Sequence, residues 1–390
     1  MSNNFDGWRS ISIAIFMALV GYSVMVSVPV LSTALVAQLD FTPAQVGRVW
    51  GADLGGMAAG AFMAALMVAW VNRRYLVWAG VVLSIGANAL CIGLVDFDQI
   101  LWLRIAAGLG SGIFTAVAVV TIGGTTKPVH TFNMLLLGFA FSTFLELQFL
   151  PLFSMDGIYL IFIGLTAVCA AFIHWIPSRP LNAEELQQQE KGEDKGEDWH
   201  VPVYMPIICL VAVCFTYINI GGYYTYIELA ALADGLTQEW TTPRLSFSSI
   251  FAIIGCVIAY FCTRFGLFKP LLASLLLMAG AVMMVSGGIT KINFVVSLFA
   301  FMTLWTFVDV YQSAMLSHMD RRGTLVALLP SVQGLGQSIG PFVAASILDG
   351  GLGYSTVFMV SGSMALVGML IYIGIMFYMH HRRPVMAEAM

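Results

Sequence analysis

The chain has 390 residues, of which 59% are hydrophobic and 10% are charged, and its mean hydropathy is +0.88. These values lie far outside the balance of a water-soluble domain, so they exclude a protein built around one core and covered by a polar surface. The formal net charge at pH 7 is −4, which is small and acidic, and we expect no nucleic-acid partner.

Long apolar stretches follow one another along the chain. A bilayer core of roughly 30 Å needs about 20 apolar residues per helix, and most stretches reach that length. The alternation that transmembrane β-strands require is absent, so the sequence predicts an all-α membrane protein. We place twelve transmembrane helices near 10–36, 46–71, 75–95, 100–122, 131–153, 157–176, 203–231, 245–263, 270–289, 292–317, 324–348 and 354–379.

One acidic, polar segment divides these stretches six and six. It spans 177–202 and carries repeated Glu, Gln, Lys, Gly and Asp, a composition typical of a solvated tether. We therefore predict an N-terminal six-helix bundle over 1–176, a cytoplasmic acidic linker over 177–202, and a C-terminal six-helix bundle with a cytoplasmic tail over 203–390.

The basic residues predict the orientation. With both termini in the cytoplasm, the cytoplasmic loops and tails hold 13 of the 17 Lys and Arg residues, and the opposite loops carry mostly acids. Arg48, Arg244 and Lys291 fall at outer helix ends, where long basic side chains reach the interface. The lead Met1–Gly7 has no signal-peptide pattern, so we expect it to be retained. The predicted location is the cell inner (cytoplasmic) membrane.

The sequence contains no pattern typical of an enzyme. Its six cysteines all lie in apolar stretches and form no Cys-x-x-Cys pair, so neither a disulfide nor a metal cluster is expected. No phosphate-binding loop, nucleophile elbow or metalloprotease helix occurs. We expect no enzymatic activity, no cofactor and no metal site.

Two loops resemble a motif of the major facilitator superfamily, Gly-x-x-x-Asp-Arg-x-Gly-Arg-Arg. The clearer copy is Thr263–Lys269, which includes Arg264, and the weaker copy is Trp70–Arg74. Asn72 and Thr263 stand where the family has an acid, so its inner-gate salt bridge is in doubt. The resemblance implies a fold of two pseudo-symmetric six-helix bundles, with Arg264 in the gating loop.

The 100–122 stretch resembles the Arg-x-x-x-Gly-x-Gly-x-Gly segment of proton-coupled drug and metabolite antiporters in that family. Arg104 leads the segment, and Gly108, Gly110 and Gly112 follow it. The resemblance implies that Arg104 takes part in proton movement. Glycines spaced two apart let helices approach closely and bend, which suits a gating role. The structural alternative is that Arg104 only fastens this helix to a neighbour.

The 324–348 stretch contains a similar glycine-rich bend that ends in Gly340-Pro341 and includes Gly336. It resembles the bend that antiporters of this family carry in their fifth helix. Here the fifth stretch, 131–153, lacks a Gly-Pro pair. We therefore assign Gly336, Gly340 and Pro341 to gating, while the antiporter signature is missing from its usual place.

Four acids lie within apolar stretches, where a charge is costly and most often functional: Asp53, Glu146, Glu228 and Asp309. Four acids against Arg104 alone cannot all stay ionised in a partly dry site, so at least one is expected to carry protons. We predict that Asp53 pairs with Arg104, which leaves the other acids for proton coupling or substrate contact. For each acid the alternative is a structural hydrogen bond.

The 203–231 stretch carries an unusual run of tyrosines. Helical spacing places Tyr217, Tyr224 and Glu228 on one face and Asn219, with Tyr223 and Tyr226, near another. An acid behind tyrosines can hold an organic cation or an aromatic ring. The alternative for Tyr223 and Tyr226 is an aromatic belt at the membrane interface.

A further polar patch is expected around Asp309, where Tyr311 and Gln312 follow in the sequence. The predicted substrate-binding residues are therefore Tyr217, Asn219, Tyr224, Glu228, Glu146 and Gln312.

These patterns predict a secondary active transporter that moves a small amphipathic organic molecule by alternating access, by proton-coupled efflux. The excess of intramembrane acids favours antiport, and the missing fifth-helix motif speaks against it. The first alternative is proton-coupled uptake or release of a specific metabolite or metal chelate, with Arg104 binding a substrate carboxylate. The second is a non-transporting membrane receptor or assembly factor. The expected partners are a small-molecule substrate, protons and the lipid bilayer, and we expect a monomer.

Overall fold

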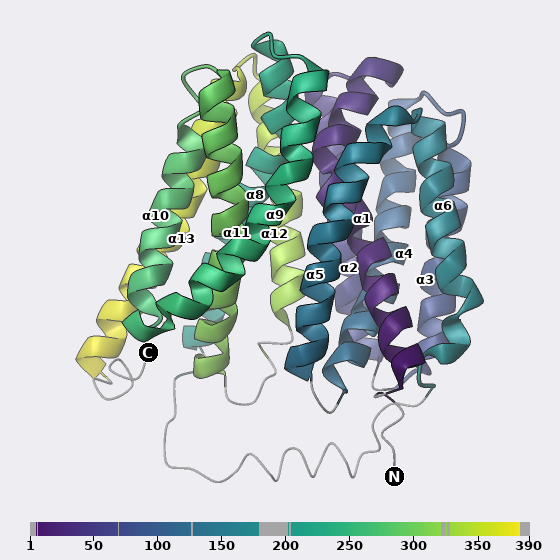
Figure 1. Cartoon of the computed structure of the whole chain (residues 1–390), viewed down its shortest axis with the longest axis horizontal. Coiled ribbons are helices and arrows are strands. Elements are labelled where there is room, and N and C mark those ends of the chain that lie inside the picture. The colour runs from purple at the N-terminus through teal and green to yellow at the C-terminus, as the bar shows by residue number, and fades with distance from the viewer. Residues whose placement is uncertain are drawn as a thin grey trace.

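The computed structural model describes residues 5, 7–68, 70–125, 128–178, 202, 204–320, 325 and 328–382. These residues form twelve α-helices and no β-strand, which confirms the predicted all-α fold (Figure 1). The first six helices are α1 (Trp8–Leu39), α2 (Pro43–Met67), α3 (Arg73–Cys91), α4 (Phe97–Gly123), α5 (Pro128–Phe149) and α6 (Met155–Ala171). The other six are α8 (Tyr204–Ala233), α9 (Gln238–Cys262), α10 (Phe268–Met283), α11 (Lys291–Met319), α12 (Leu329–Asp349) and α13 (Tyr354–Arg382).

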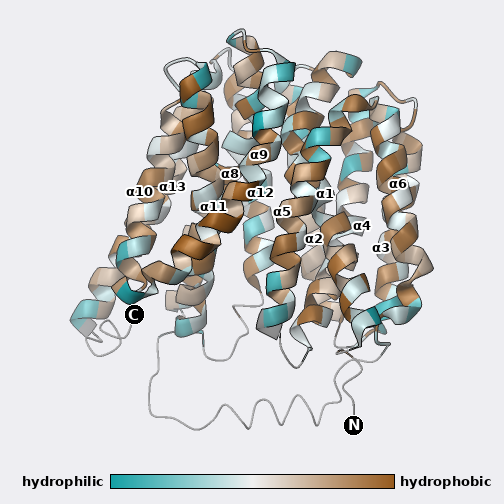
Figure 2. Ribbon diagram, in the orientation of Figure 1, coloured by the Kyte–Doolittle hydropathy of each residue, from teal (hydrophilic) through white to brown (hydrophobic). Residues whose placement is uncertain are grey.

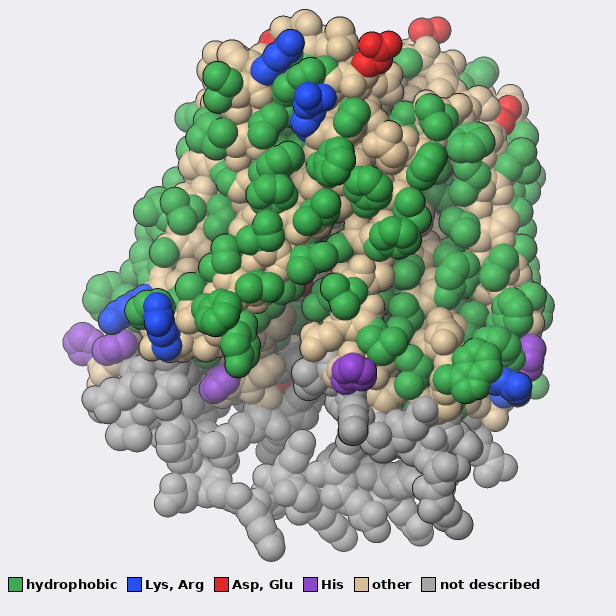
Figure 3. Space-filling view, in the orientation of Figure 1, with side chains coloured by type: hydrophobic (Ala, Val, Ile, Leu, Met, Phe, Trp, Pro, Cys, Tyr) green, Lys and Arg blue, Asp and Glu red, His purple; other side chains and the backbone are tan. Residues whose placement is uncertain are grey.

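The helices have the character of membrane spans. Nine of the described helices are long and apolar enough to cross a membrane, and α6 and α10 are apolar but shorter. Hydrophobic colouring predominates along the middle of the helices (Figure 2), and charged side chains gather at the two edges of the visible surface (Figure 3). The chain is therefore a multi-pass membrane protein, because lipid can face such an apolar flank and water cannot.

Polar residues mark several helix starts, as a chain that leaves lipid requires. Thr42 precedes α2 and forms a capping box with Gln45, in which each side chain accepts a hydrogen bond from the other residue's backbone N–H. Thr290 and Asn293 form the same box at α11. These caps satisfy backbone donors that would otherwise lack a partner at the helix ends.

The helix bounds agree with the prediction within a few residues, and the largest difference is at α9. This helix begins at Gln238 and not near residue 245, although Pro243 lies inside it. A proline close to a helix start removes few backbone hydrogen bonds, so the helix continues through it. The earlier start places Thr241 and Thr242 on α9, and both contact an acid described below.

The two groups of six helices form two halves, and they repeat one packing plan. In the first half α1 packs on α5, α2 on α4 and α3 on α6; in the second, the equivalent helices pack as α8 on α12, α9 on α11 and α10 on α13. The start of α1 and the end of α13 lie at the same face of the molecule, here called the terminal face (Figure 1). The opposite face, where α1 ends and α13 begins, is the far face.

The halves meet along one surface, here called the boundary. Across it α2 packs on α12, α5 on α9 and α1 on α8. The predicted linker over 177–202 lies outside the described residues apart from Pro177, Ser178 and Pro202, as does the tail beyond Arg382. The exact domain limits therefore stay a prediction.

Glycines set the closest helix contacts on both sides of the boundary. A Cβ atom at Gly108 or Gly112 of α4 would overlap a backbone carbonyl of α2, and one at Gly110 would meet the backbone of α3. In the second half, a Cβ at Gly336 or Gly340 of α12 would meet the backbone of α8. The glycines predicted for gating are thus sites where helices touch backbone to backbone.

Candidate functional site

The first polar centre lies inside the N-terminal half. Arg104 on α4 is fully buried, and its Nη1 lies 3.5 Å from Oδ2 of Asp53 on α2. Its Nη2 donates to Oδ1 of Asn88 at 2.9 Å, and its guanidinium lies 5.0 Å from the centre of the Tyr159 ring. The predicted pair of Asp53 and Arg104 is confirmed, and both charges are enclosed within one half, away from the boundary.

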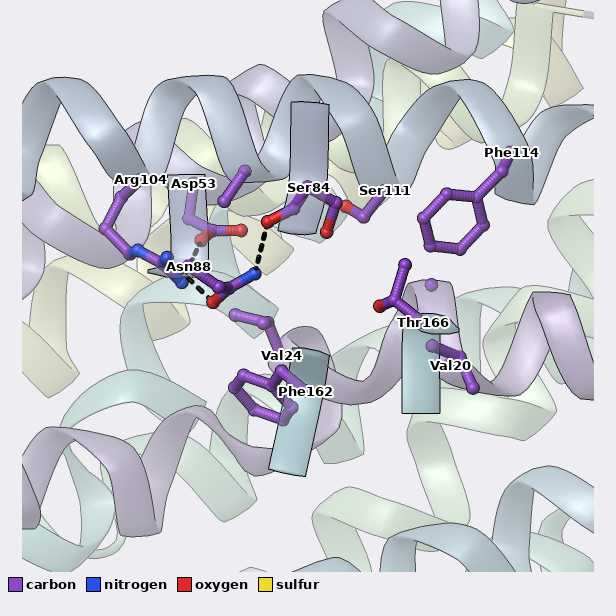
Figure 4. A pocket seen from close by; sticks show the side chains of 12 residues that line it. Val20, Val24, Asp53, Ser84, Asn88, Arg104, Ser111, Phe114, Phe162 and Thr166 are labelled. Atoms are coloured by element: carbon purple, nitrogen blue, oxygen red, sulfur yellow. Dashed lines mark hydrogen bonds and ion pairs between the residues drawn. The ribbon is translucent and has the colours of Figure 1, made fainter. Parts of the chain in front are cut away.

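A small polar cavity adjoins this pair (Figure 4). Its volume is about 20 Å³, and Ser84, Asn88, Ser111 and Thr166 line it together with apolar side chains. Nε of Arg104 has no partner among the described protein groups. A cavity of this size holds about one water molecule, which would have polar partners here.

Glu146 on α5 is the second polar centre. It contacts α1 of the same half, a helix that also packs against the other half. Its Oε2 accepts hydrogen bonds from Ser23 and Ser27 of α1, both at 2.7 Å, and its Oε1 accepts one from Ser142, also at 2.7 Å. Glu146 is half-buried. Three hydroxyls therefore donate to this carboxylate, and it forms no ion pair with a described base.

Glu228 on α8 forms a third centre, this time at the boundary itself. Its Oε1 accepts hydrogen bonds from Thr241 and Thr242 of α9, both at 3.1 Å. Its Oε2 accepts one at 3.4 Å from Thr33 of α1, in the other half. Glu228 is fully buried. Its surroundings thus repeat those of Glu146, with threonines in place of serines.

Neither Glu146 nor Glu228 takes part in an ion pair with a described residue. Within the described ranges the ion pairs are Arg104 with Asp53 and Arg48 with Asp349. The second pair joins α2 to α12 near the far face. Arg48 thus pairs across the boundary, in addition to lying at an outer helix end as predicted.

Asp309 on α11 is the fourth acid, and its surroundings differ from those expected. Its Oδ1 accepts hydrogen bonds from the Tyr217 hydroxyl at 2.9 Å and from Nε2 of Gln333 at 2.6 Å. Tyr311 instead donates to the carbonyl of Ala259. The expected patch of Asp309 with its sequence neighbours is wrong, because successive residues of a helix point in different directions.

Two predicted substrate contacts lie inside the C-terminal half. Gln312 is fully buried and donates to Oγ1 of Thr216 at 2.9 Å, between α11 and α8. Asn219 is also fully buried and donates to the carbonyl of Ser361 on α13 at 2.8 Å. The structure does not bring either side chain to the boundary.

The tyrosines of α8 are buried contacts between helices. Tyr224 donates to the carbonyl of Val26 on α1 at 2.9 Å, and Tyr226 donates to the carbonyl of Pro43 at 2.9 Å. Tyr223 shares a hydrogen bond of 2.8 Å with Ser297 of α11. The alternative of an interfacial belt for Tyr223 and Tyr226 is therefore wrong, since both side chains are fully buried.

The hydrogen bonds that cross the boundary all lie toward the far face. Besides the bonds of Thr33, Tyr224, Tyr226 and Arg48, Ser338 of α12 donates to the carbonyl of Gly51 on α2 at 2.6 Å. None of the hydrogen bonds identified between described residues of different halves lies toward the terminal face, and the surface is hollowed between the halves (Figure 3). The hydrogen bonds between the described halves thus lie toward the far face, although α12 also packs closely on α2 at Gly334 and Ala58, nearer the terminal face.

The three acids near the boundary lie at increasing depth from the terminal face. With a rise of 1.5 Å per residue, Asp309, Glu146 and Glu228 lie about 15, 27 and 36 Å along their helices from that face. Tyr224 lies within electrostatic reach of both glutamates. Three carboxylates, here called the column, thus lie at different depths near the boundary, and the deepest, Glu228, is fully buried.

The predicted gating residues have different surroundings. Pro341 lies inside α12, at its packing surface with α2 and α8. Arg264 is exposed, and its guanidinium lies 4.7 Å from the centre of the neighbouring Phe265 ring.

Sequence reasoning missed the hydroxyl groups around the acids. Ser23 and Ser27 are one helical turn apart on α1, as are Ser142 and Glu146 on α5, so a four-residue polar spacing was present as a signal. Thr33, Thr241, Thr242 and Gln333 gave no such signal, because they join the acids only through contacts between helices.

Solved transporters share this fold. A mutant of the nucleoside transporter NupG superposes with a TM-score of 0.72 at 12% identity, over 94% of this chain and 99% of that chain. An auto-inhibited peptide transporter of the POT family gives 0.73 at 8% identity, over 94% and 96% of the two chains. The inward-open xylose transporter XylE from E. coli gives 0.71 at 14% identity, over 93% and 94%.

No curated protein sequence matches the chain. The sequence model of the Major Facilitator Superfamily, however, matches residues 11–320, which is most of its length. With the twelve-helix fold in two halves and the transporter structures that share it, the match is decisive: the chain belongs to the Major Facilitator Superfamily and is a multi-pass membrane transporter.

Proposed function

We propose that this protein is a secondary active transporter of the inner membrane that exports a small amphipathic organic molecule in exchange for protons. The basic residues favour a cytoplasmic terminal face. In that orientation the hydrogen-bonded far face is external, and the hollow between the halves opens to the cytoplasm. The two halves rock about the boundary, and this motion exposes the site to one side at a time.

The observation that carries the proposal is the pair of glutamates held by hydroxyls alone. Glu146 and Glu228 each accept three hydrogen bonds from Ser or Thr side chains and pair with no described base. A carboxylate removed from water without a cation is stabilised by binding a proton. Hydroxyls suit both states, because a hydroxyl can donate to a carboxylate or accept from a carboxylic acid.

The two glutamates have different access. Glu146 is half-buried, whereas Glu228 is fully buried and contacts Thr33 of the other half. When the far face opens, the contact between Thr33 and Glu228 breaks and Glu228 meets external water. We propose that Glu228 takes up a proton from outside, that this proton is transferred to the Glu146 carboxylate, and that Glu146 releases it inside, which would couple the rocking motion to the proton gradient.

We propose that protonation of Glu146 weakens substrate binding, which gives antiport. Release of the proton inside then precedes substrate loading. The pair of Asp53 and Arg104 is enclosed in the N-terminal half, and we assign it a coupling role through α2 and α4. The structure named for a D-xylose–proton symporter has the same fold, so the fold is compatible with proton coupling.

The test is the pH change inside proteoliposomes when a substrate is added, screened over cationic, neutral and anionic compounds. Wild-type protein should move protons with a substrate, and Glu146→Gln and Glu228→Gln should each abolish that movement. Glu239→Gln, which removes an exposed acid at the start of α9, is the matched control and should behave as wild type. Substrate counterflow in the wild type without any pH change would refute proton coupling.

A further inference from the structure

We propose that the substrate is an organic monocation carrying an aromatic ring, bound in the hollow between Asp309 of one half and Tyr22 of the other. This inference rests on the proposed transport function and specifies its substrate class. It depends on three features of the described residues: a carboxylate oxygen of Asp309 that no described group satisfies, aromatic rings from both halves near this carboxylate, and the enclosure of Arg104 elsewhere.

Asp309 has one satisfied and one free oxygen. Both protein donors, Tyr217 and Gln333, bond to Oδ1, and no described group donates to Oδ2. The side chain is half-buried, so Oδ2 is not sealed in the protein. Tyr217 and Gln333 hold the carboxylate in place by its first oxygen and leave the second for a ligand. A charge near the middle of a membrane protein without a partner is typical of a binding position.

Tyr22 of the other half lies near Asp309. It belongs to α1, lies within electrostatic reach of Asp309, and packs edge-on against Phe139 of α5 with ring centres 6.0 Å apart. Tyr217, which bonds Asp309, lies close to both Tyr22 and Trp305. Rings from α1, α8 and α11 therefore lie near the Asp309 carboxylate. A cation beside such rings gains about 0.5–2 kcal/mol from each well-placed one.

The described bases offer an anionic ligand no counter-charge at this place. Arg104 is fully buried between Asp53, Asn88 and Cys91 within the N-terminal half, so it does not face the hollow. A substrate carboxylate here would meet Asp309 and Glu146 with no described base to offset the repulsion, and its desolvation would be uncompensated. A cation meets the opposite situation, since the nearby fixed charges are negative.

The depth of the acids gives the cation a direction. Asp309 is the shallowest of the column and Glu146 the next, about 12 Å further along the boundary. A monocation with a ring spans part of that distance, with its charge at Asp309 and its body toward Glu146. Loss of a proton from Glu146 strengthens the field that holds the cation, which ties binding to the proposed exchange.

Equilibrium binding to the purified full chain in detergent tests the inference without any gradient. Isothermal titration compares benzyltrimethylammonium with its neutral isostere neopentylbenzene and with the anion phenylmethanesulfonate, which share size and ring. Ethidium and tetraphenylphosphonium extend the set of cations to larger rings. At least one cation should bind saturably, and benzyltrimethylammonium should bind at least tenfold more tightly than either uncharged or anionic counterpart.

Variants locate the site. Asp309→Asn keeps the shape and removes the charge, and it should weaken cation binding about tenfold, whereas Tyr22→Leu should weaken it about fivefold through loss of the ring. Glu239→Gln should leave the affinity unchanged. If Asp309→Asn does not fold, the cation affinity of Tyr22→Leu still tests whether the site is here. Saturable binding by none of the three cations, tighter binding of the anion, or equal affinity in wild type and both site variants would overturn the inference.

Failure of this inference and of the proposed function give different results. Cation binding with no substrate-driven pH change in proteoliposomes would retain the substrate class and remove proton coupling. Proton movement driven only by neutral or anionic compounds would retain coupling and remove the cation.

Discussion

The hydroxyl of Thr33 on α1 crosses the boundary and donates to the carboxylate of Glu228 on α8 at 3.4 Å. The same helix carries Ser23 and Ser27, which hold Glu146 within the N-terminal half. One helix therefore contacts both hydroxyl-bound carboxylates. A change of protonation at either glutamate would alter the hydrogen bonds of α1, and this helix connects the two directly.

The sequence of α1 suits this helix to transmit a change between Glu146 and Glu228. Pro29 lies inside the helix between Ser27 and Thr33 and removes the N–H that the carbonyl of Met25 would accept. Tyr224 of the other half donates to the next carbonyl, that of Val26. A helix with one backbone bond missing bends more easily there, so its two ends can move by different amounts.

We predict that Thr33→Val shifts the protein toward the conformation with an open far face. The substitution keeps the volume and removes the bond to Glu228, a loss of about 1 kcal/mol, or about fivefold in the conformational ratio. The distance distribution between spin labels on the exposed positions Ala37 and Leu352, at the far face of each half, reports the shift. Thr121→Val is the control, because that buried hydroxyl bonds only within α4.

Tyr224→Phe is predicted to act in the same direction, and Tyr223→Phe is not. The two tyrosines are neighbours and both fully buried, but only the Tyr224 hydroxyl bonds across the boundary. Removal of that hydroxyl deprives the Val26 carbonyl of a hydrogen bond that it has only when the far face is closed. The closed conformation should therefore lose about 1 kcal/mol of stability relative to the open one. The same spin-label distances decide: an equal response of both variants would contradict the assignment of Tyr224 to the closure.

Asp53→Asn is predicted to destabilise the N-terminal half strongly. It leaves the fully buried Arg104 without its counter-charge, a change that costs about 3–5 kcal/mol in other proteins. Thermal melting in detergent should show a marked drop in the midpoint. The double variant Asp53→Asn with Arg104→Gln should recover part of the loss, because it removes the orphaned charge. An unchanged midpoint for the single variant would mean that Asn88 and the adjoining cavity suffice to hold the guanidinium.

Gly108→Ala is predicted to lower stability by about 1–3 kcal/mol, the range for overpacking in a close contact. A Cβ at this position overlaps the carbonyl oxygen of Asp53, and a backbone cannot move aside as a flexible side chain can. Gly123→Ala on the same helix has open space around the new methyl group and is the control, which should be neutral or slightly stabilising. Equal melting midpoints of the two variants would refute tight packing of α4 on α2.

Much of the architecture follows from local sequence. Apolar length predicts the helices, because each span must satisfy its own backbone in lipid. The pair of Asp53 and Arg104 was also predictable, since a buried arginine requires an anion and Asp53 is at similar depth on a helix that packs beside it. The start of α9 was not predictable from the sequence. Pro243 usually marks the end or the start of a helix, but a proline within the first turns of a helix removes few hydrogen bonds, and the sequence does not show how much helix precedes it.

The sequence by itself determined that this chain spans the membrane many times, divides six and six, and places four acids where charge is costly. Only the tertiary structure decided what surrounds those acids. Ser23, Thr33, Thr241 and Gln333 lie far in sequence from the carboxylates they contact, and their partners depend on how rigid helices pack. The physical reason is that the free energy of transfer to lipid depends on each segment alone, so it can be judged from local sequence. A hydrogen bond between two helices forms only when both helices are packed in their final positions.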